Sequence, residues 1–436
     1  MIETEIRPLV SEEHREAPSH GNTPTYLAAW NVSNIILGIG LLGVPYACAI
    51  LGWLSIPAVL LFGLLSLYTG ILIGRAMYNN PDAAYSPPEL DSHESPCKRV
   101  YVTFADIAKQ LLPRFGKPFA ASLVILEIFG AQVLYTILLG ESLAKLLNTN
   151  LNTSLSREQW AVVIAYCVFP FTFIQSIKVI SCFSTAATAC LIGVTLGVVS
   201  FCIMSALSMQ QLVSEFGLPV VDKLPSGLAI ILFSYCCHGV LPGIEYGMKF
   251  PRSYPKMMTV TFGATILIKA LFGVLPAYLF GRQTAQIFLD NMSPAPRLQL
   301  TVQILITVTS MLTIPLTMYF IRRELDVFVK LDHFRYKHGS VKALLLSILI
   351  QLIIYNLGLV IAVFVPEFAL IMALIGSITG SFLVFILPPL FMLSFCRQIP
   401  LPRRVLFWFL IVFGIIVLIF GVVFSTLNLL QAYQLI

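Results

Sequence analysis

The chain has 436 residues, of which 58% are hydrophobic and only 11% are charged. Soluble proteins carry about 25% charged residues, so this composition excludes a soluble protein and indicates a polytopic membrane protein. The net charge of +6 does not indicate nucleic-acid binding, because basic residues in membrane proteins mark the cytoplasmic loops.

Residues 1–25 are polar and are expected to form a disordered cytoplasmic tail, not a signal peptide. Within this tail, Glu5, Leu9 and Val10 resemble the acidic dileucine signal that routes membrane proteins to endosomes, lysosomes or vesicles. Val10 stands where Leu or Ile is usual, so a chance match is the alternative. The expected location is an endolysosomal or vesicular membrane, with the plasma membrane as the alternative.

A membrane-spanning helix needs about 20 apolar residues. Eleven segments meet this length, so the expected fold is an all-α integral membrane protein with 11 transmembrane helices. The segments are 26–50, 53–77, 118–147, 159–177, 179–208, 225–248, 257–280, 299–321, 341–365, 367–394 and 405–428. The membrane domain is thus expected at 26–428, followed by a short outer or lumenal tail at 429–436.

The loops between these segments predict the orientation of the chain. Most of the 27 Lys and Arg residues fall in the inner loops when the N-terminus is placed in the cytoplasm. Eleven crossings then place the C-terminus on the lumenal or extracellular side. The sequons at Asn152 and Asn291 fall in predicted outer loops and are expected glycosylation sites. In the long inner loop, residues 103–115 have apolar side chains at helical spacing, which predicts an amphipathic helix on the inner membrane surface.

Helix-weakening residues are concentrated in the middle of the first segment, at Gly38, Gly40, Gly43 and Pro45. Non-helical backbone at membrane depth is tolerated only where it is buried in protein or lines a cavity. The three glycines also spell G-x-G-x-x-G, but a dinucleotide site needs a preceding strand and an acidic residue about 20 positions later, where Phe62 stands. The pattern therefore predicts a broken membrane helix rather than a nucleotide site.

The sixth segment carries a matching interruption at Gly239, Pro242 and Gly243. Five crossings separate the two segments, so they run in opposite directions. Interrupted segments at corresponding positions of two halves indicate a transporter binding site; the alternative is that Gly and Pro are simply more frequent in membrane helices.

These interruptions predict a site for a small zwitterion. The half-helix that begins near Gly40 would present unpaired N–H groups and its positive end to a carboxylate, and carbonyls near Leu37 and Cys236 would accept from an ammonium group. An α-amino acid has both groups. The predicted substrate-binding residues are Asn34, Gly38, Ile39, Gly40, Leu41, Tyr135, Tyr235, Cys236, His238 and Gly239.

Few ionisable residues lie inside the predicted segments, and such residues are functional candidates. Glu127, His238, Glu245 and Lys269 are the predicted set for proton coupling or gating. His238 titrates in a suitable range, with a neutral structural histidine as the alternative. Lys269 is expected to pair with Glu127 or Glu245, either as a relay or as a structural ion pair. Tyr135 shares a helix face with Glu127 and is placed to close over a substrate, unless it is an ordinary buried tyrosine.

A sodium site is also conceivable. Asn34 with Thr309, Ser310 and Thr313 could supply oxygen ligands, although hydroxyls on membrane helices usually bond back to their own backbone. The nine cysteines show neither metal nor redox spacing. No cofactor and no other metal site are expected.

These motifs resemble the amino acid/auxin permease family, and within it the vesicular inhibitory amino acid transporter branch and its plant vacuolar relatives. The resemblance is carried by Ala29 to Asn34, Gly38 to Tyr46, His238 to Glu245 and Ala373 to Ser381. It implies a LeuT-type 5+5 inverted repeat, with repeats at 26–208 and 225–394 and helix eleven at 405–428. It also implies broken helices 1 and 6 and coupled amino acid transport. Sodium-coupled relatives use an Asn of the first helix and a Thr of the eighth, and Asn34 matches the former.

The sequence as a whole predicts a secondary active transporter of neutral amino acids. Protons are the expected coupling ion, and sodium is the alternative. The expected partners are the amino acid substrate and membrane lipid, without nucleic acid, and the expected state is a monomer. The alternative from another class is an amino acid sensor with little flux. An enzyme is not expected, because no nucleophile–base set, metal cluster or phosphate loop is present in the sequence.

Overall fold

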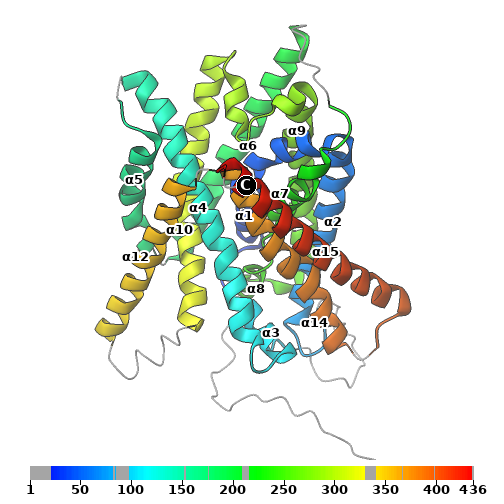
Figure 1. Cartoon of the computed structure of the whole chain (residues 1–436). Coiled ribbons are helices and arrows are strands. Elements are labelled where there is room, and N and C mark those ends of the chain that lie inside the picture. The colour runs from blue at the N-terminus through cyan, green and yellow to red at the C-terminus, as the bar shows by residue number, and fades with distance from the viewer. Residues whose placement is uncertain are drawn as a thin grey trace, which may run out of the picture.

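The computed structural model describes residues 21–81, 84, 98–151, 154–174, 176–208, 216–328, 340–365, 367–396 and 398–434. These residues form an all-α bundle, as expected (Figure 1). The sorting motif at Glu5, Leu9 and Val10 and the sequon residue Asn152 lie outside the described residues, so those two predictions stay untested.

The first half of the chain forms α1 (Thr25–Leu51), η1 (Gly52–Leu54), α2 (Ser55–Ala76), α3 (Phe104–Leu111), α4 (Gly116–Leu151), α5 (Arg157–Val168), η2 (Phe169–Phe173) and α6 (Ile177–Leu207). The second half forms η3 (Val221–Lys223), α7 (Leu224–Tyr235), α8 (Leu241–Gly247), η4 (Pro251–Ser253), α9 (Tyr254–Phe280), η5 (Gly281–Gln283), η6 (Phe288–Met292), α10 (Pro296–Phe328), α12 (Ser340–Phe364), α13 (Phe368–Ile375), η7 (Gly376–Ile386), α14 (Leu387–Phe395) and α15 (Leu401–Ala432).

Helices cover each of the eleven predicted segments. By length and composition, eight helical stretches among the described residues can cross a membrane, with α1 through α2 counted as one stretch. The membrane protein class is therefore confirmed, while the count of eleven crossings remains a prediction.

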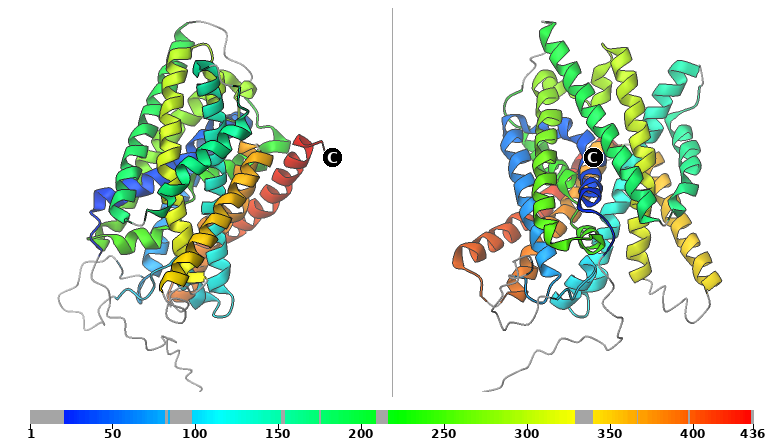
Figure 2. Two further views of the ribbon diagram at one scale, coloured as in Figure 1. Left: turned by 90° about the vertical axis from the view of Figure 1, so that its left-hand side faces the viewer. Right: turned by 180° about the vertical axis from the view of Figure 1, so that it is seen from behind.

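Burial separates central helices from peripheral ones. The apolar 18-residue stretch of α4 is 78% buried inside the protein, whereas the corresponding stretch of α12 is 28% buried. A helix that is apolar all round and buried belongs in a core, and α1 fits this description because it packs against α6, α7, α9 and α10. The views in Figure 2 show α15 and α12 on the outside of the bundle, where exposed apolar side chains suit lipid.

Helix α3 defines one end of the bundle. We call the end that carries α3 and the connection between α14 and α15 the inner end, and the opposite end the outer end (Figure 1). The Thr103 side chain caps α3 by accepting from Asp106 N, as an N-cap residue should. The amphipathic helix predicted here is present, but its apolar face packs on α4 and α14 instead of lipid; Phe104, for example, meets Phe391 at 5.4 Å between ring centroids.

Both predicted interruptions are present, and they differ in extent. In α1 only Gly38 leaves helical geometry, with φ −29° and ψ −128°, so the expected unwound stretch is a one-residue kink. Between α7 and α8 the chain is non-helical over residues 236–240. Pro242 is the second residue of α8, where its missing N–H leaves no intrahelical bond unmade.

A third irregularity, not predicted, lies in the tenth segment. Residues Gly376–Ile386 form a π-helix. This geometry is rare in proteins, and where it occurs it is often found at functional sites. A Cβ at Gly376 would lie 2.4 Å from Ala229 O, and one at Gly380 would lie 2.6 Å from Leu232. Small residues let helix backbones approach closely in membranes, so these glycines allow the tenth segment to pack closely against α7.

Candidate functional site

A cavity of about 50 Å³ lies where the two interruptions meet. It is lined by α1, α4, the 236–240 gap and α10. The lining residues are Ile35, Ile39, Gly40, Glu127, Ile128, Ala131, Tyr135, Phe233, Cys236, Val240, Thr313, Leu316, Thr317 and Phe320. This volume has room for a few water molecules, so an amino-acid-sized ligand requires the surrounding helices to move apart.

The kink in α1 is held by Tyr135 of α4. Its hydroxyl accepts a hydrogen bond from Ile39 N at 2.9 Å, which satisfies an amide next to the non-helical Gly38. A Cβ at Gly38 would lie 2.3 Å from that same hydroxyl, so a larger residue at this position would displace the Tyr135 hydroxyl from Ile39 N. Gly38 and Ile39 were predicted from the interruption of the first segment, and Tyr135 from the helix face that it shares with Glu127; the structure brings them together.

Replacing Tyr135 with phenylalanine should raise the substrate concentration for half-maximal uptake about tenfold. The change removes the acceptor of Ile39 N and leaves a buried donor unpaired, which costs about 1–3 kcal/mol. Concentration-dependent uptake into proteoliposomes measures the shift. Tyr355→Phe is the matched control, since Tyr355 is also buried but bonds Ala165 O away from the cavity. Equal effects of the two changes would contradict a role for Tyr135 in the site.

Glu127 is the ionisable residue of this cavity. Its side chain is 7% exposed, and within the described part of the chain its Oε2 has no hydrogen-bond partner. A carboxylate inside the membrane is costly unless it is neutralised or paired. Glu127 is therefore suited to receive a proton or a ligand ammonium group, on the wall that also carries Ala131 and Tyr135.

His238 lies in the predicted gap but faces α2 instead of the cavity. Its Nε2 is 2.9 Å from Thr69 Oγ1 and 3.1 Å from Ser66 O. The ring is fully buried, and its Nδ1 has no partner among the described residues. His238 therefore connects the non-helical gap to α2, and any effect on a ligand in the cavity must pass through the backbone of the gap.

Lys269 does not make the expected ion pair with Glu127 or Glu245. Its ammonium group donates to both Ser234 O and Ser234 Oγ and lies 3.8 Å from the centroid of the Tyr235 ring. The physical reason is that α7 ends at Tyr235, so the carbonyls of its last turn lack intrahelical donors and form a negative helix end. Lys269 caps the half-helix.

Glu245 belongs to a cluster at the inner end. It is fully buried and pairs with Arg99 at 2.7 Å, and the Tyr78 hydroxyl donates to its other oxygen at 2.6 Å. Burial and the Glu245 carboxylate both raise the pKa of Tyr78, so its hydroxyl keeps the proton that it donates. The Arg99 guanidinium also lies over the rings of Tyr78 and Tyr246.

The candidate sodium residues do not converge in a formed site. Thr309, Ser310 and Thr313 each donate to the carbonyl four residues earlier, at 2.8, 2.9 and 2.8 Å, which is the alternative that the sequence left open. Asn34 is fully buried, and neither polar atom of its amide has a partner in the described part of the chain. Sodium binding remains a prediction.

Three further predicted residues lie close to the cavity without lining it. Leu41 and Tyr235 are fully buried, and a Cβ at Gly239 would lie 2.6 Å from Val124.

At the outer end, the Asn291 amide accepts from Ala285 N at 2.8 Å and donates to Gln283 O at 2.9 Å. Glycosylation of Asn291 remains a prediction, and it would replace the second of these bonds.

Several residues that line the central cavity were not predicted from the sequence. Thr317 and Phe320 of α10, Ile35 of α1 and Val240 of the gap line the chamber. A weak signal existed, because Ile35 and Ile39 share a helix face, as do Thr313 and Thr317. Neither pair is unusual in a membrane helix, so the signal alone does not select them.

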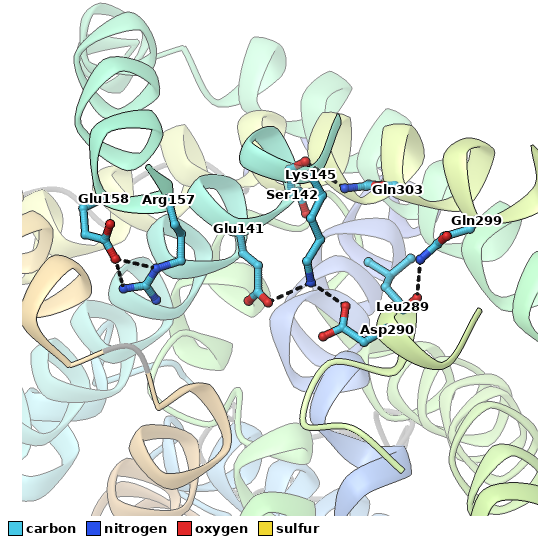
Figure 3. Close-up of polar contacts among 9 residues, drawn as sticks. All are labelled: Glu141, Ser142, Lys145, Arg157, Glu158, Leu289, Asp290, Gln299 and Gln303. Atoms are coloured by element: carbon cyan, nitrogen blue, oxygen red, sulfur yellow. Dashed lines mark hydrogen bonds and ion pairs between the residues drawn. The ribbon is translucent and has the colours of Figure 1, made fainter. Parts of the chain in front are cut away.

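Polar contacts join several elements at the outer end (Figure 3). Lys145 of α4 pairs with Glu141 at 2.9 Å and with Asp290 of η6, and Gln303 of α10 donates to Ser142 O at 2.8 Å. Lys145 and Asp290 are 43% and 41% exposed, so this pair contributes about 0–1 kcal/mol. This exposed pair therefore ties the outer end weakly, whereas at the inner end Arg99, whose side chain is 18% exposed, pairs with the fully buried Glu245.

The sequence matches the family described as transmembrane amino acid transporter protein over residues 21–430. The chain belongs to this family. As a member of it, the chain is a membrane transport protein and not an enzyme, because the curated relatives are named transporters. The predicted family, amino acid/auxin permease, is confirmed.

Two relatives illustrate the similarity of this transporter. It is 27% identical to the vesicular inhibitory amino acid transporter of Xenopus laevis, over 93% of this chain and 77% of the relative. It is 26% identical to the amino acid transporter AVT1C of Arabidopsis thaliana, over 91% of this chain and 68% of the relative.

Among solved structures, MhsT in complex with L-phenylalanine matches with a TM-score of 0.55 at 11% identity, over 94% of this chain and 100% of that one. At such low identity the match shows the fold alone, which is that of the LeuT-type transporters.

Proposed function

We propose that this transporter moves neutral amino acids across a membrane by alternating access. The observation that carries the proposal is the meeting of the α1 kink and the 236–240 gap at one buried cavity between α4 and α10. Irregular backbone at such a site supplies N–H and carbonyl groups to a ligand in place of charged side chains. The names of the relatives, which refer to inhibitory amino acids and to amino acids, agree with this ligand class.

The composition of the cavity supports a neutral substrate. Glu127 is the one charged side chain among the described residues that line it, and most of the others are apolar. An ammonium group would pair with Glu127, while a carboxylate would lie at the start of the helix that resumes after Gly38. An acidic side chain would meet repulsion from Glu127, and a basic one would need a second anion.

The membrane topology belongs to the same proposal. Eleven crossings arranged as a 5+5 inverted repeat would make α1 and the α7–α8 pair equivalent elements of the two halves. The N-terminus would be cytoplasmic and the C-terminus lumenal. A vesicular or endolysosomal membrane is the proposed location, supported by the names of the vesicular relatives.

Protons are the proposed coupling ion, with Glu127 and His238 as the groups that exchange them. Sodium coupling is the second candidate, and it is favoured by the buried amide of Asn34, which has no partner among the described residues. Uptake into proteoliposomes separates them, because flux driven by a pH gradient alone supports protons and flux that requires a Na⁺ gradient supports sodium. Saturable binding without flux would reject both in favour of an amino acid sensor.

Replacing His238 with glutamine should flatten the dependence of uptake on pH, because an imidazole can exchange a proton and an amide cannot. Glutamine keeps a polar group for Thr69 and Ser66 but carries no titratable proton. Initial uptake rates at a series of pH values measure the profile. Cys237→Ser, a change at the neighbouring buried position, is the control. A glutamine variant with the parental pH profile would remove His238 from proton coupling.

A further inference from the structure

A second and larger cavity, of about 320 Å³, lies at the outer end of the bundle. Its walls come from the ends of α1 and α15, the start of α7, and residues Gln286 and Glu367. None of the described residues lines both this cavity and the central one. Its volume is at the lower end of the range of small-molecule sites.

One cation and one anion line this outer cavity. Lys223 precedes α7 and Glu367 precedes α13, and no ion pair joins the two within the described part of the chain. Gln286 fixes the carboxylate, because its Nε2 donates to Glu367 Oε2 at 2.9 Å while its Oε1 accepts from Ala369 N at 3.1 Å. The cavity therefore presents separated charges of both signs, of which the negative one is held in place.

Neutral polar groups complete the lining. Asn428 donates to Ser226 Oγ at 3.2 Å, which joins α15 to α7, and the Tyr46 and Gln431 side chains border the same space. A purely apolar ligand would leave Lys223 and Glu367 without an oppositely charged partner, and a singly charged ligand would provide one for only one of them. A small zwitterion satisfies both, with its ammonium group at Glu367 and its carboxylate at Lys223.

We propose that the outer cavity binds a second small zwitterion of the amino acid class, distinct from the one in the central cavity. The binding rests on the contacts above, and only its effect on transport rests on the proposed function. A ligand held between Lys223 and Glu367 would connect α7 to α13. Because α7 is one of the interrupted elements expected to move, this connection favours one conformation over the other. A high concentration of this ligand at the outer end would then slow the transport cycle.

Binding stoichiometry tests the proposal without any assumption about flux. Purified protein is dialysed to equilibrium against a panel of tritiated L-amino acids and γ-aminobutyrate. The parent should bind two molecules per chain, and the double variant Lys223→Met/Glu367→Gln should bind one. Gln at position 367 keeps an oxygen for Gln286. Asp222→Asn, an exposed neighbour that does not line the cavity, should behave like the parent.

The central site is counted separately with Gly40→Leu, which fills the central cavity and should also reduce binding to one molecule. If the Lys223/Glu367 variant keeps the parental stoichiometry, the outer site is rejected. If instead that variant loses a molecule while Gly40→Leu changes nothing and uptake is absent, the outer site stands and the proposed function fails. In uptake assays, a high amino acid concentration at the outer end should inhibit uptake by the parent but not by the double variant. The two single variants show whether one of the two charges is sufficient for this inhibition.

Discussion

Leucine in place of Gly40 should reduce amino acid uptake at least about 100-fold while the protein remains folded in the membrane. A Cβ at position 40 would lie 2.7 Å from Ser234 Cα and 3.2 Å from Ser234 O, so the clash is with the backbone of α7 and no side chain can rotate to relieve it. A larger side chain would separate α1 from α7 and fill the cavity that Gly40 lines. Uptake into proteoliposomes and size-exclusion profiles measure function and folding.

The chain offers a close control for this change. Gly263 lies in α9, and no atom of the described residues comes within 4 Å of a Cβ built there, so Gly263→Leu makes the same chemical change on the outer surface of the bundle and should leave uptake near the parental level. Gly40→Ala tests the graded effect, because even one methyl group at 2.7 Å from Ser234 Cα forces a shift. Uptake that survives in Gly40→Leu would contradict the assignment of the central cavity as the transport site.

Arg99→Ala should open the inner end. Removing one partner of a buried ion pair costs about 3–5 kcal/mol, because the other charge is left buried. Glu245 is fully buried. The state with a closed inner end is therefore destabilised by this free energy relative to an open state in which water solvates the carboxylate. Cys236 lines the central cavity and is 5% exposed; its labelling by a water-soluble maleimide, located by mass spectrometry, should rise by roughly 10²-fold or more, and uptake should fall.

Two further variants separate charge from packing at the inner end. Arg99→Met/Glu245→Gln removes both charges, keeps an acceptor for the Tyr78 hydroxyl and should restore protection of Cys236, because a neutral pair of similar volume avoids the uncompensated charge. Lys98→Ala, at the adjacent exposed position, should have no effect. Lys145→Ala, at the exposed outer pair, should change labelling little. Cys236 that stays protected in Arg99→Ala would show that this pair does not close the inner end.

The sequence located the interruptions but not their form. Gly38 and the residues around Gly239 were predicted to break their helices because glycine and proline weaken the helical hydrogen-bond ladder wherever they occur. Whether the break becomes a one-residue kink or a five-residue gap depends on what receives the freed backbone groups. At Ile39 the partner is the Tyr135 hydroxyl from α4, and no local pattern in α1 encodes that contact.

Partners of buried charges were the least predictable feature. Lys269 was expected beside a carboxylate, yet its partner is the backbone end of α7, because a helix end carries a partial negative charge that is invisible in the residue types. No pattern in the sequence linked Arg99 to Glu245, yet the two pair across 146 positions of the chain.

Composition and apolar segment length by themselves determined that this chain is an all-α membrane protein, since an exposed backbone must form its own hydrogen bonds in lipid. The local density of glycine and proline determined where its helices are weak. Only the tertiary structure decided which side chains line the central cavity, that Arg99 pairs with the buried Glu245 at the inner end, and that an outer cavity exists between α1, α7 and α15. Those features depend on distances between segments far apart in the chain, and packing in three dimensions sets such distances.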